Sequence, residues 1–330
     1  MADINYETRN LDQNTYKIFA GVYSDFRTAA ISDYKFELEP LLYEDFIDAV
    51  EKGLENCIVL FENDIPTAFL AYTTVISEAI ELNVIHCLGT EDLLTKRKLL
   101  LEQFLKDTEQ ERKEKTVCYP MIGSQSQFVT DISNYGFNFV GLAVLRFFFG
   151  DEFDCKTILK EVELKPLEEG YTFDSWKDEY LDASIEIVNK AFINSSDALF
   201  DPRFKTIEGT RDILTKISNG VYGEFLPEIV TILKYNNEVC GLCLVNITDG
   251  RIANIPIFAI APEHQGKGLS KYLLKNSIST LATWVEDNKR DFSEINTTTE
   301  TDNYPALKMY RSVGFKEDYY YPQSYLTANN

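Results

Sequence analysis

The chain has 330 residues, about twice the length of a typical domain, so its length predicts two domains. Hydrophobic residues make up 45% of it and charged residues 26%, which is typical of packed globular proteins and excludes a disordered chain. Its formal net charge of −21 would repel phosphate backbones, so nucleic acid is not an expected partner. The same charge favours a cationic substrate such as an amine.

The sequence shows neither a signal peptide nor a membrane-spanning segment, and this predicts the cellular compartment. The N-terminal residues are polar and contain no hydrophobic core of a signal peptide. The most apolar stretch, residues 140–150, is too short to span a bilayer and contains Arg146. We therefore expect a cytoplasmic protein without membrane contact, and the sequence leaves an oligomer possible.

The cysteines predict no metal site. Cys240 and Cys243 form a C-x-x-C pattern, yet residues three apart on a strand face opposite sides and cannot chelate one ion. The chain has only two histidines, His86 and His264. We expect reduced cysteines that pack in apolar surroundings. The six are Cys57, Cys87, Cys118, Cys155, Cys240 and Cys243.

The two halves of the chain repeat one order of predicted elements. Each half begins with a β-hairpin, whose turn contains Asn63-Asp64 in the first half and Asn236-Asn237 in the second. A third strand, a helix, a fourth strand, a short helix and a Gly-Phe pair follow in each half. The first half has strands at 57–62, 67–75, 79–88 and 116–122 and a helix at 91–114. The second half has strands at 229–235, 239–247, 251–261 and 294–300 and a short helix at 304–313.

Matching landmarks favour an internal duplication. Gly136 matches Gly314 at a separation of 178 residues, and Leu88 matches Ile260 at a separation of 172. Any two α/β domains show some alternation, but this element order differs from the common doubly wound pattern. We predict an α/β (α+β) fold of two tandem domains, residues 1–155 and 156–330, each a mixed, mostly antiparallel sheet flanked by helices.

A glycine-containing loop in the second half is the first candidate binding site. Gly266 and Gly268 lie between an apolar strand and a helix, where glycine lets the backbone approach a ligand and expose its N–H groups. The positive end of the helix dipole adds to them, and Lys267 can add a full charge, which together suit a pyrophosphate. The loop is neither a P-loop nor a dinucleotide-binding fingerprint. The alternative is a tight helix entry with a solvated lysine.

The second candidate site is the helix at 304–313. Asn303, Ala306 and Tyr310 have a spacing that puts them on one helix face. Tyr310 is a phenol that could protonate a departing thiolate. The alternative is a core aromatic, in a chain with 19 tyrosines.

Together, the segments FAIAPEHQGKGLSKYLL and N-x-x-A-x-x-x-Y-x-x-x-G-F closely resemble the GNAT acetyltransferase superfamily. The resemblance implies an acetyl-CoA-dependent N-acetyltransferase that needs no metal. It implies that the backbone of Gln265, Gly266, Lys267, Gly268, Leu269 and Ser270 holds the pyrophosphate. It further implies that Phe258 and Ile260 pair with pantetheine, that Asn303 contacts the pantetheine arm and that Tyr310 is the general acid. The family often has Gln or Arg where this chain has Glu263.

The resemblance extends to the first half as a degenerate copy, similar to tandem GNAT architectures. The separations above place Leu94 and Lys96 where the second half has its two glycines, and place Gln125 and Ile132 at the positions of Asn303 and Tyr310. We therefore expect the first domain to be non-catalytic.

The expected reaction is direct transfer of acetyl from acetyl-CoA to a primary amine, on a small molecule or a peptide. The amine must lose a proton before it attacks, and Glu300 is our candidate base, with Glu224 and Glu228 as rivals. Alternatives are an acyl- or aminoacyl-transferase with another donor, or a non-catalytic CoA-binding or scaffolding protein.

Overall fold

The computed structural model describes residues 5–33, 40–75, 79–149, 159, 162, 166–249 and 251–328. The chain forms two compact units. Unit 1 comprises Met1–Val140 and Tyr321–Asn330, and unit 2 comprises Gly141–Tyr320. The chain therefore passes into unit 2 within strand β6 (Asn138–Phe148) and returns to unit 1 within strand β15 (Lys316–Leu326). The predicted boundary after residue 155, and Cys155 itself, lie outside the described residues.

Unit 1 contains one mixed sheet in the order β1-β2-β3-β4-β5, with the end of β15 beside β5. All neighbours are antiparallel except β4 and β5, which run parallel. The strands are β1 (Tyr6–Asn10), β2 (Asn56–Glu62), β3 (Ile65–Thr73), β4 (Ala79–Cys87) and β5 (Thr116–Pro120). The helices are α1 (Tyr16–Asp33), α2 (Tyr43–Glu51), α3 (Leu93–Asp107), η1 (Glu111–Lys113), η2 (Gly123–Phe128) and α4 (Val129–Ser133).

Both faces of this sheet are buried, because apolar residues continue along its strands without alternating with polar ones. On β2, Ile58 and Leu60 belong to the core beneath α3, whereas Val59 and Phe61 belong to the core beneath α1 and α2. The sheet is thus flanked by helices on both sides, as predicted.

Unit 2 repeats this element order, with helices η3 (Asp178–Tyr180), α6 (Leu181–Phe192) and α8 (Ile207–Ser218) after its first strand. Its further helices are α7 (Asp197–Phe200), η4 (Pro202–Lys205), η5 (Pro227–Ile229), η6 (Pro262–His264), α9 (Leu269–Asp287) and α10 (Tyr304–Val313). Its strands besides β6 and β15 are β7 (Tyr171–Ser175), β8 (Glu224–Phe225), β9 (Thr231–Tyr235), β10 (Glu238–Cys243), β11 (Asn246–Asp249), β12 (Ile252–Asn254), β13 (Phe258–Ile260) and β14 (Glu294–Glu300).

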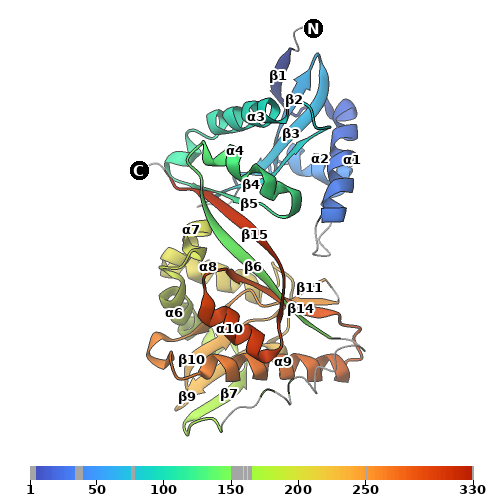
Figure 1. Cartoon of the computed structure of the whole chain (residues 1–330). Helices are drawn as coiled ribbons and strands as arrows, with labels where there is room; N and C mark the ends of the chain where they lie inside the picture. The colour runs from blue at the N-terminus through green and yellow to red at the C-terminus, as the bar shows by residue number, and fades with distance from the viewer. Residues whose placement is uncertain are drawn as a thin grey trace. The chain divides into compact units, whose positions relative to one another are not determined.

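The strands of unit 2 form two groups. One has the order β13-β10-β9-β7, and the other has the order β15-β6-β14-β12-β11-β8. Helices α9 and α10 pack on one face, over a core that contains Leu273 and Leu307 (Figure 1). Helices α6 and α8 cover the other face, over a core that contains Val188 and Leu214. The predicted α/β class with mostly antiparallel sheets is confirmed.

The predicted hairpins are confirmed at both turns. Asn63, Asp64, Asn236 and Asn237 all have positive φ, between 48° and 72°. Two successive left-handed residues form the type I′ turn that joins adjacent antiparallel strands, and Asn and Asp tolerate that conformation better than most residues.

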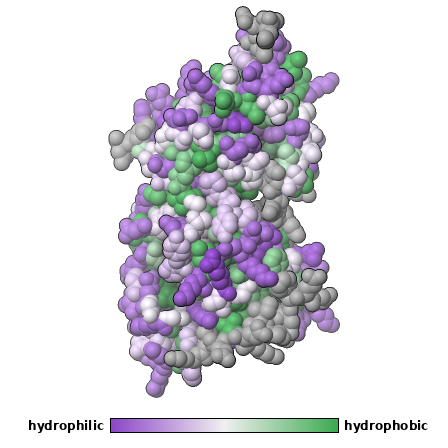
Figure 2. Space-filling view, viewed as in Figure 1, coloured by the Kyte–Doolittle hydropathy of each residue, from purple (hydrophilic) through white to green (hydrophobic). Residues whose placement is uncertain are grey.

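On the face of the molecule shown in Figure 2, hydrophilic and hydrophobic residues are interspersed. Within the described part of the chain, no helix has both the length and the apolar character needed to cross a membrane.

Candidate active site

The two strand groups of unit 2 part at a defined point. β12 runs parallel to β14, with Asn254 opposite Asn296, and the N–H of Ile255 donates to the carbonyl of Asn296 at 2.9 Å. Pro256 follows and has no N–H with which to continue the ladder. Beyond it β13 pairs with β10, whereas β14 pairs with β6. The predicted single strand at 251–261 is therefore two strands in different groups.

The outer edge of β13 carries the predicted cofactor contacts. The N–H of Ala261 donates to the carbonyl of Cys240 in β10, and the carbonyl of Ile257 accepts from the N–H of Leu244, which directly follows β10. Backbone groups of successive residues point to opposite sides of a strand, so Phe258 and Ile260 direct theirs away from β10. The carbonyl of Ile260 accepts a hydrogen bond from Nε2 of Gln265 at 2.9 Å. The outward N–H and C=O of Phe258 and N–H of Ile260 suit an extended, amide-containing ligand.

The glycine loop follows β13 and leads into α9. Gly266 and Gly268 both have φ of +75°, and a Cβ at either would meet nothing within 4 Å. Glycine is favoured here by the left-handed backbone and not by crowding, and there is open space beside it. Gly268 is the N-cap residue of α9.

The loop and the start of α9 present a row of backbone donors. Within the described residues, the N–H groups of Gly266, Lys267 and Gly268 have no backbone acceptor. The first-turn N–H groups of Leu269 and Ser270 lie at the positive end of the α9 dipole, which favours the binding of an anion.

Gln265 differs from the rest of the predicted set. Its N–H donates to the carbonyl of Pro262 at 3.2 Å, so its backbone is engaged within the loop. Its contribution is the side-chain contact with Ile260, which ties the loop to β13.

Two side chains of the loop contact β7. Nζ of Lys267 donates to Oη of Tyr171 at 3.2 Å, and Nδ1 of His264 lies 2.7 Å from the same oxygen. Because His264 lies in a polar surface-loop sequence, sequence reasoning missed this contact with a residue 93 positions away.

Tyr310 lies on the inner face of α10, and its side chain lies next to β13. Its ring centroid is 6.3 Å from that of Phe258 and 5.1 Å from that of Phe315, and its side chain is buried. Burial raises the pKa of the phenol well above its usual value, the nearby Cys243 thiol raises it further, and a hydrogen bond with Thr297 acts in the opposite direction. Tyr310 therefore holds its proton at neutral pH, although a packing role also fits its burial.

Asn303 caps the start of α10 through its side chain. Asn303 precedes α10 as its N-cap residue, and its side-chain oxygen accepts a hydrogen bond from the N–H of Ala306 at 3.2 Å. Such caps satisfy free donors of a helix start. The side chain of Asn303 is exposed and its oxygen is used locally, whereas the side chain of Tyr310 is buried.

Glu300 ends β14 and anchors the start of α7. Its Oε1 accepts hydrogen bonds from the N–H of Ser196, at 3.2 Å, and from the Ser196 hydroxyl. Partial burial of the Asp197 carboxyl raises its pKa, and the charge of Glu300 raises it further, although part of Asp197 reaches solvent. The rival residues Glu224 and Glu228 are both exposed, and Glu224 faces Arg290 at 3.6 Å.

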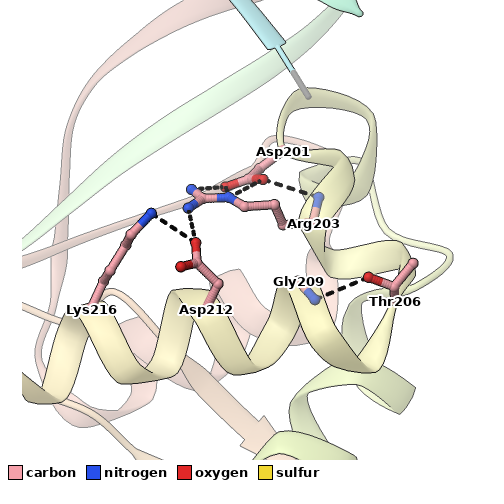
Figure 3. Close-up of polar contacts among 6 residues, drawn as sticks. All are labelled: Asp201, Arg203, Thr206, Gly209, Asp212 and Lys216. Atoms are coloured by element: carbon pink, nitrogen blue, oxygen red, sulfur yellow. Dashed lines mark hydrogen bonds and ion pairs between the residues drawn. The ribbon is translucent and has the colours of Figure 1, made fainter. Parts of the chain in front are cut away.

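An ion-pair cluster fixes η4 against α8 (Figure 3). Arg203 pairs with Asp201 at 2.6 Å and with Asp212 at 2.8 Å, and Lys216 also reaches Asp212. A Cβ on Gly209 would lie 2.4 Å from the carbonyl oxygen of Arg203, so only glycine allows this approach. The carboxylates of Asp201 and Asp212 are thus already neutralised by cations of the protein.

Unit 1 has a different loop at the corresponding place. α3 begins at Leu93 and α9 at Leu269, a separation of 176 residues (269 − 93), so Asp92 and not Lys96 corresponds to Gly268. Asp92 has the same left-handed backbone, with φ of 51°. Its carboxylate lies at the helix start, where it would repel a phosphate.

In unit 1, a glutamine side chain bridges strands β4 and β5 where they separate. β4 and β5 pair only up to Glu81 and Cys118. Beyond that point the side-chain oxygen of Gln125 accepts a hydrogen bond from the N–H of Ile85 at 3.0 Å, and another from the hydroxyl of Tyr119. Gln125, which the sequence separation matches to Asn303, thus bonds to the edge of β4, whereas the outer edge of β13 is open in unit 2.

The cations of α3 in unit 1 are also engaged. Lys96 pairs with Glu62 at 2.6 Å, and Arg97 pairs with Asp131 at 2.7 Å, all largely buried. These cations are thus already paired with carboxylates of the same unit. In the described residues of either unit, no three His, Cys, Asp or Glu side chains gather as a metal ion would require.

Comparison with known proteins agrees with this geometry. Residues 202–315 match the model of the Acetyltransferase (GNAT) family, and this segment includes the outer edge of β13, the glycine loop and Tyr310. Unit 2 carries a GNAT domain. No curated protein sequence matches the chain significantly.

Solved structures extend the GNAT fold to the whole chain. A GCN5-related N-acetyltransferase from Sphaerobacter thermophilus aligns over 98% of this chain and 96% of its own, with a TM-score of 0.64 and 14% identity. A tandem GNAT protein from the clavulanic acid biosynthesis pathway aligns over 99% of both chains, with a TM-score of 0.62 and 12% identity. A glucosamine N-acetyltransferase region of a fungal β-N-acetylglucosaminidase aligns over 99% of this chain and 38% of its own, with a TM-score of 0.60 and 11% identity. The chain therefore has a tandem GNAT fold.

Proposed function

We propose that this protein is an N-acetyltransferase that moves an acetyl group from acetyl-CoA to a primary amine by direct attack. The observation that carries the proposal is the outward edge of β13, at Phe258 and Ile260, which leads into a loop of free N–H donors at Gly266–Gly268. An extended amide arm that ends in a diphosphate matches both parts.

Each predicted residue has a role in this proposal. The N–H groups from Gly266 to Ser270 hold the diphosphate, with the charge of Lys267 beside them. Phe258 and Ile260 pair with the pantetheine arm, and Gln265 fixes the loop to β13. Asn303 acts mainly by starting α10, which carries Tyr310.

Acetyl-CoA, when bound, supplies an acetyl group activated as a thioester. An N–H of the β13 edge would polarise its carbonyl, because a fixed donor stabilises the charge that develops there. Tyr310 gives its proton to the departing sulfur. The amine loses its own proton to Glu300, through Oε2, since both contacts of Ser196 use Oε1.

The amine class is supported by the names of the structural neighbours, which include an N-acetyltransferase and a glucosamine N-acetyltransferase region. It is also supported by the net charge of −21, which attracts cations. The protein is expected to accept small-molecule or peptide amines.

An acceptor screen tests the proposal. Free thiol released from acetyl-CoA is measured with amines of rising positive charge and with anionic amines, at low and high salt. We expect cationic amines to raise release above hydrolysis without an acceptor, and salt to reduce their advantage. A preference for anionic amines would show that the net charge serves solubility only and does not select the substrate. CoA binding without transfer to any amine would favour a non-catalytic role, and faster release from longer acyl-CoAs would favour another donor.

A further inference from the structure

Three side chains link the glycine loop to β7 through one oxygen atom. An ammonium group can only donate, so Tyr171 Oη accepts from Nζ of Lys267 at 3.2 Å. The single phenol proton is then available for Nδ1 of His264, 2.7 Å away. His264 accepts this proton in the tautomer that carries its own proton on Nε2. The direction of the Lys267 bond follows from valence alone.

Tyr171 is itself held in place. Its side chain is buried, and its ring lies 4.7 Å from that of Tyr235 and edge-on to His264 at 5.6 Å. Nζ of Lys267 lies 3.2 Å from the hydroxyl oxygen and 5.9 Å from the centroid of the Tyr171 ring, so the ammonium contacts the oxygen and not the face of the ring. The hydrogen bond to Tyr171 also raises the pKa of Lys267. The end of an otherwise exposed lysine is therefore fixed by a rigid partner.

A fixed lysine binds an anion at a lower entropic cost. A free lysine side chain loses rotamer freedom when it contacts a phosphate, whereas contact with Tyr171 has already removed part of that freedom. An ammonium has three N–H donors and Tyr171 accepts from one, so two are available for phosphate oxygens. Lys267 lies between Gly266 and Gly268, whose N–H groups are free donors for the same anion.

We propose that Tyr171 is a positioning residue that holds Lys267 ready for the diphosphate of CoA, with His264 orienting the Tyr171 hydroxyl. This inference rests on the proposed function, since it needs CoA to bind at the glycine loop. Tyr171 acts through Lys267 and does not itself take part in acetyl transfer.

Tyr171→Phe tests the inference, because it removes the oxygen and keeps the ring. We expect the dissociation constant for CoA to rise about 3- to 10-fold, as for the loss of one hydrogen bond. The affinity for pantetheine, which has no diphosphate, should not change. Tyr235→Phe is the matched control, since it removes the hydroxyl of the neighbouring ring, and it should leave both affinities as they are. Binding is measured by calorimetry and thermal shift.

A double-mutant cycle separates positioning from general packing. Once Lys267→Met has removed the ammonium, Tyr171→Phe should change CoA affinity by less than about 1.5-fold. Three results would overturn the inference. Tyr171→Phe could weaken CoA and pantetheine binding equally, its effect on CoA affinity could add fully to that of Lys267→Met, or the variant could bind CoA more tightly than the wild-type protein. If Tyr171→Phe does not fold, His264→Ala tests the same link, with a smaller loss of CoA affinity expected in the same direction and no loss overturning it. If the wild-type protein binds no CoA, the proposed function fails first.

Discussion

Replacing Tyr310 with phenylalanine should reduce turnover by about 10²- to 10⁴-fold, the usual range for loss of a general acid. The phenol is buried beside Phe258 and keeps its proton, because burial raises its pKa. Phenylalanine fills the same space without a proton to give. Affinity for acetyl-CoA should change little, since the ring contacts with Phe258 and Phe315 persist. Turnover is measured as free thiol release with the best amine of the screen.

The control is Tyr304→Phe, on the same helix. Tyr304 is 72% exposed at the start of α10, and loss of its hydroxyl should leave turnover unchanged. Wild-type turnover in Tyr310→Phe would reduce Tyr310 to a packing residue. A protein that no longer folds would support the core-aromatic alternative, which a melting curve distinguishes from a folded, slow enzyme.

Gly268→Glu should abolish CoA binding. The position has φ of +75°, which side chains other than glycine rarely adopt, and the new carboxylate would enter the site of the diphosphate. It would also place a negative charge against the free N–H groups at the start of α9. Calorimetric titration with CoA should show no heat of binding at concentrations that saturate the wild-type protein.

Gly53→Glu in unit 1 is the matched control for this substitution. Gly53 also has a positive φ, of 68°, and a Cβ there would meet nothing within 4 Å, so the backbone strain and the added charge are alike at the two positions. We expect the control to lose a similar amount of stability and to bind CoA normally. Normal CoA binding by Gly268→Glu would show that the diphosphate lies elsewhere.

Local sequence patterns predicted much of unit 2. The strand at 294–300 and the helix at 304–313 coincide with β14 and α10. The strand alternates weakly, but it is rich in threonine, and the helix is bounded by the capping residue Asn303 and by Gly314, whose φ is 110°. Such signals are local, and propensity and capping are sufficient to find them.

The breaks within strands were not predicted. The run at 251–261 is apolar except for Arg251 and Asn254, so its pattern indicates a single strand, whereas Pro256 interrupts the ladder between β12 and β13. The run at 239–247 divides in the same way at Leu244 and Val245. Where a strand changes partners depends on its neighbours in the sheet, and that information is not local.

The pairing of strands that are far apart in the sequence was also not predicted. Residues 142–148 lie in the first half of the chain, yet they pair with β14, and residues 323–326 pair with β5. The contact of Tyr171 with His264 and Lys267 has the same cause, because strand order brings together residues more than 90 positions apart. The correspondence of Lys96 with Gly268 was wrong because the loops before α3 and α9 differ in length.

Titration of the wild-type protein with CoA tests the central claim most directly. We expect one binding site per chain, because unit 2 has the open β13 edge and the free loop donors, whereas Gln125 bonds to the β4 edge and Asp92 lies at the helix start in unit 1. That single site should be lost in Gly268→Glu and retained in Gly53→Glu. Two equivalent sites per chain would contradict the degeneracy of unit 1, and no binding at all would contradict the proposed function.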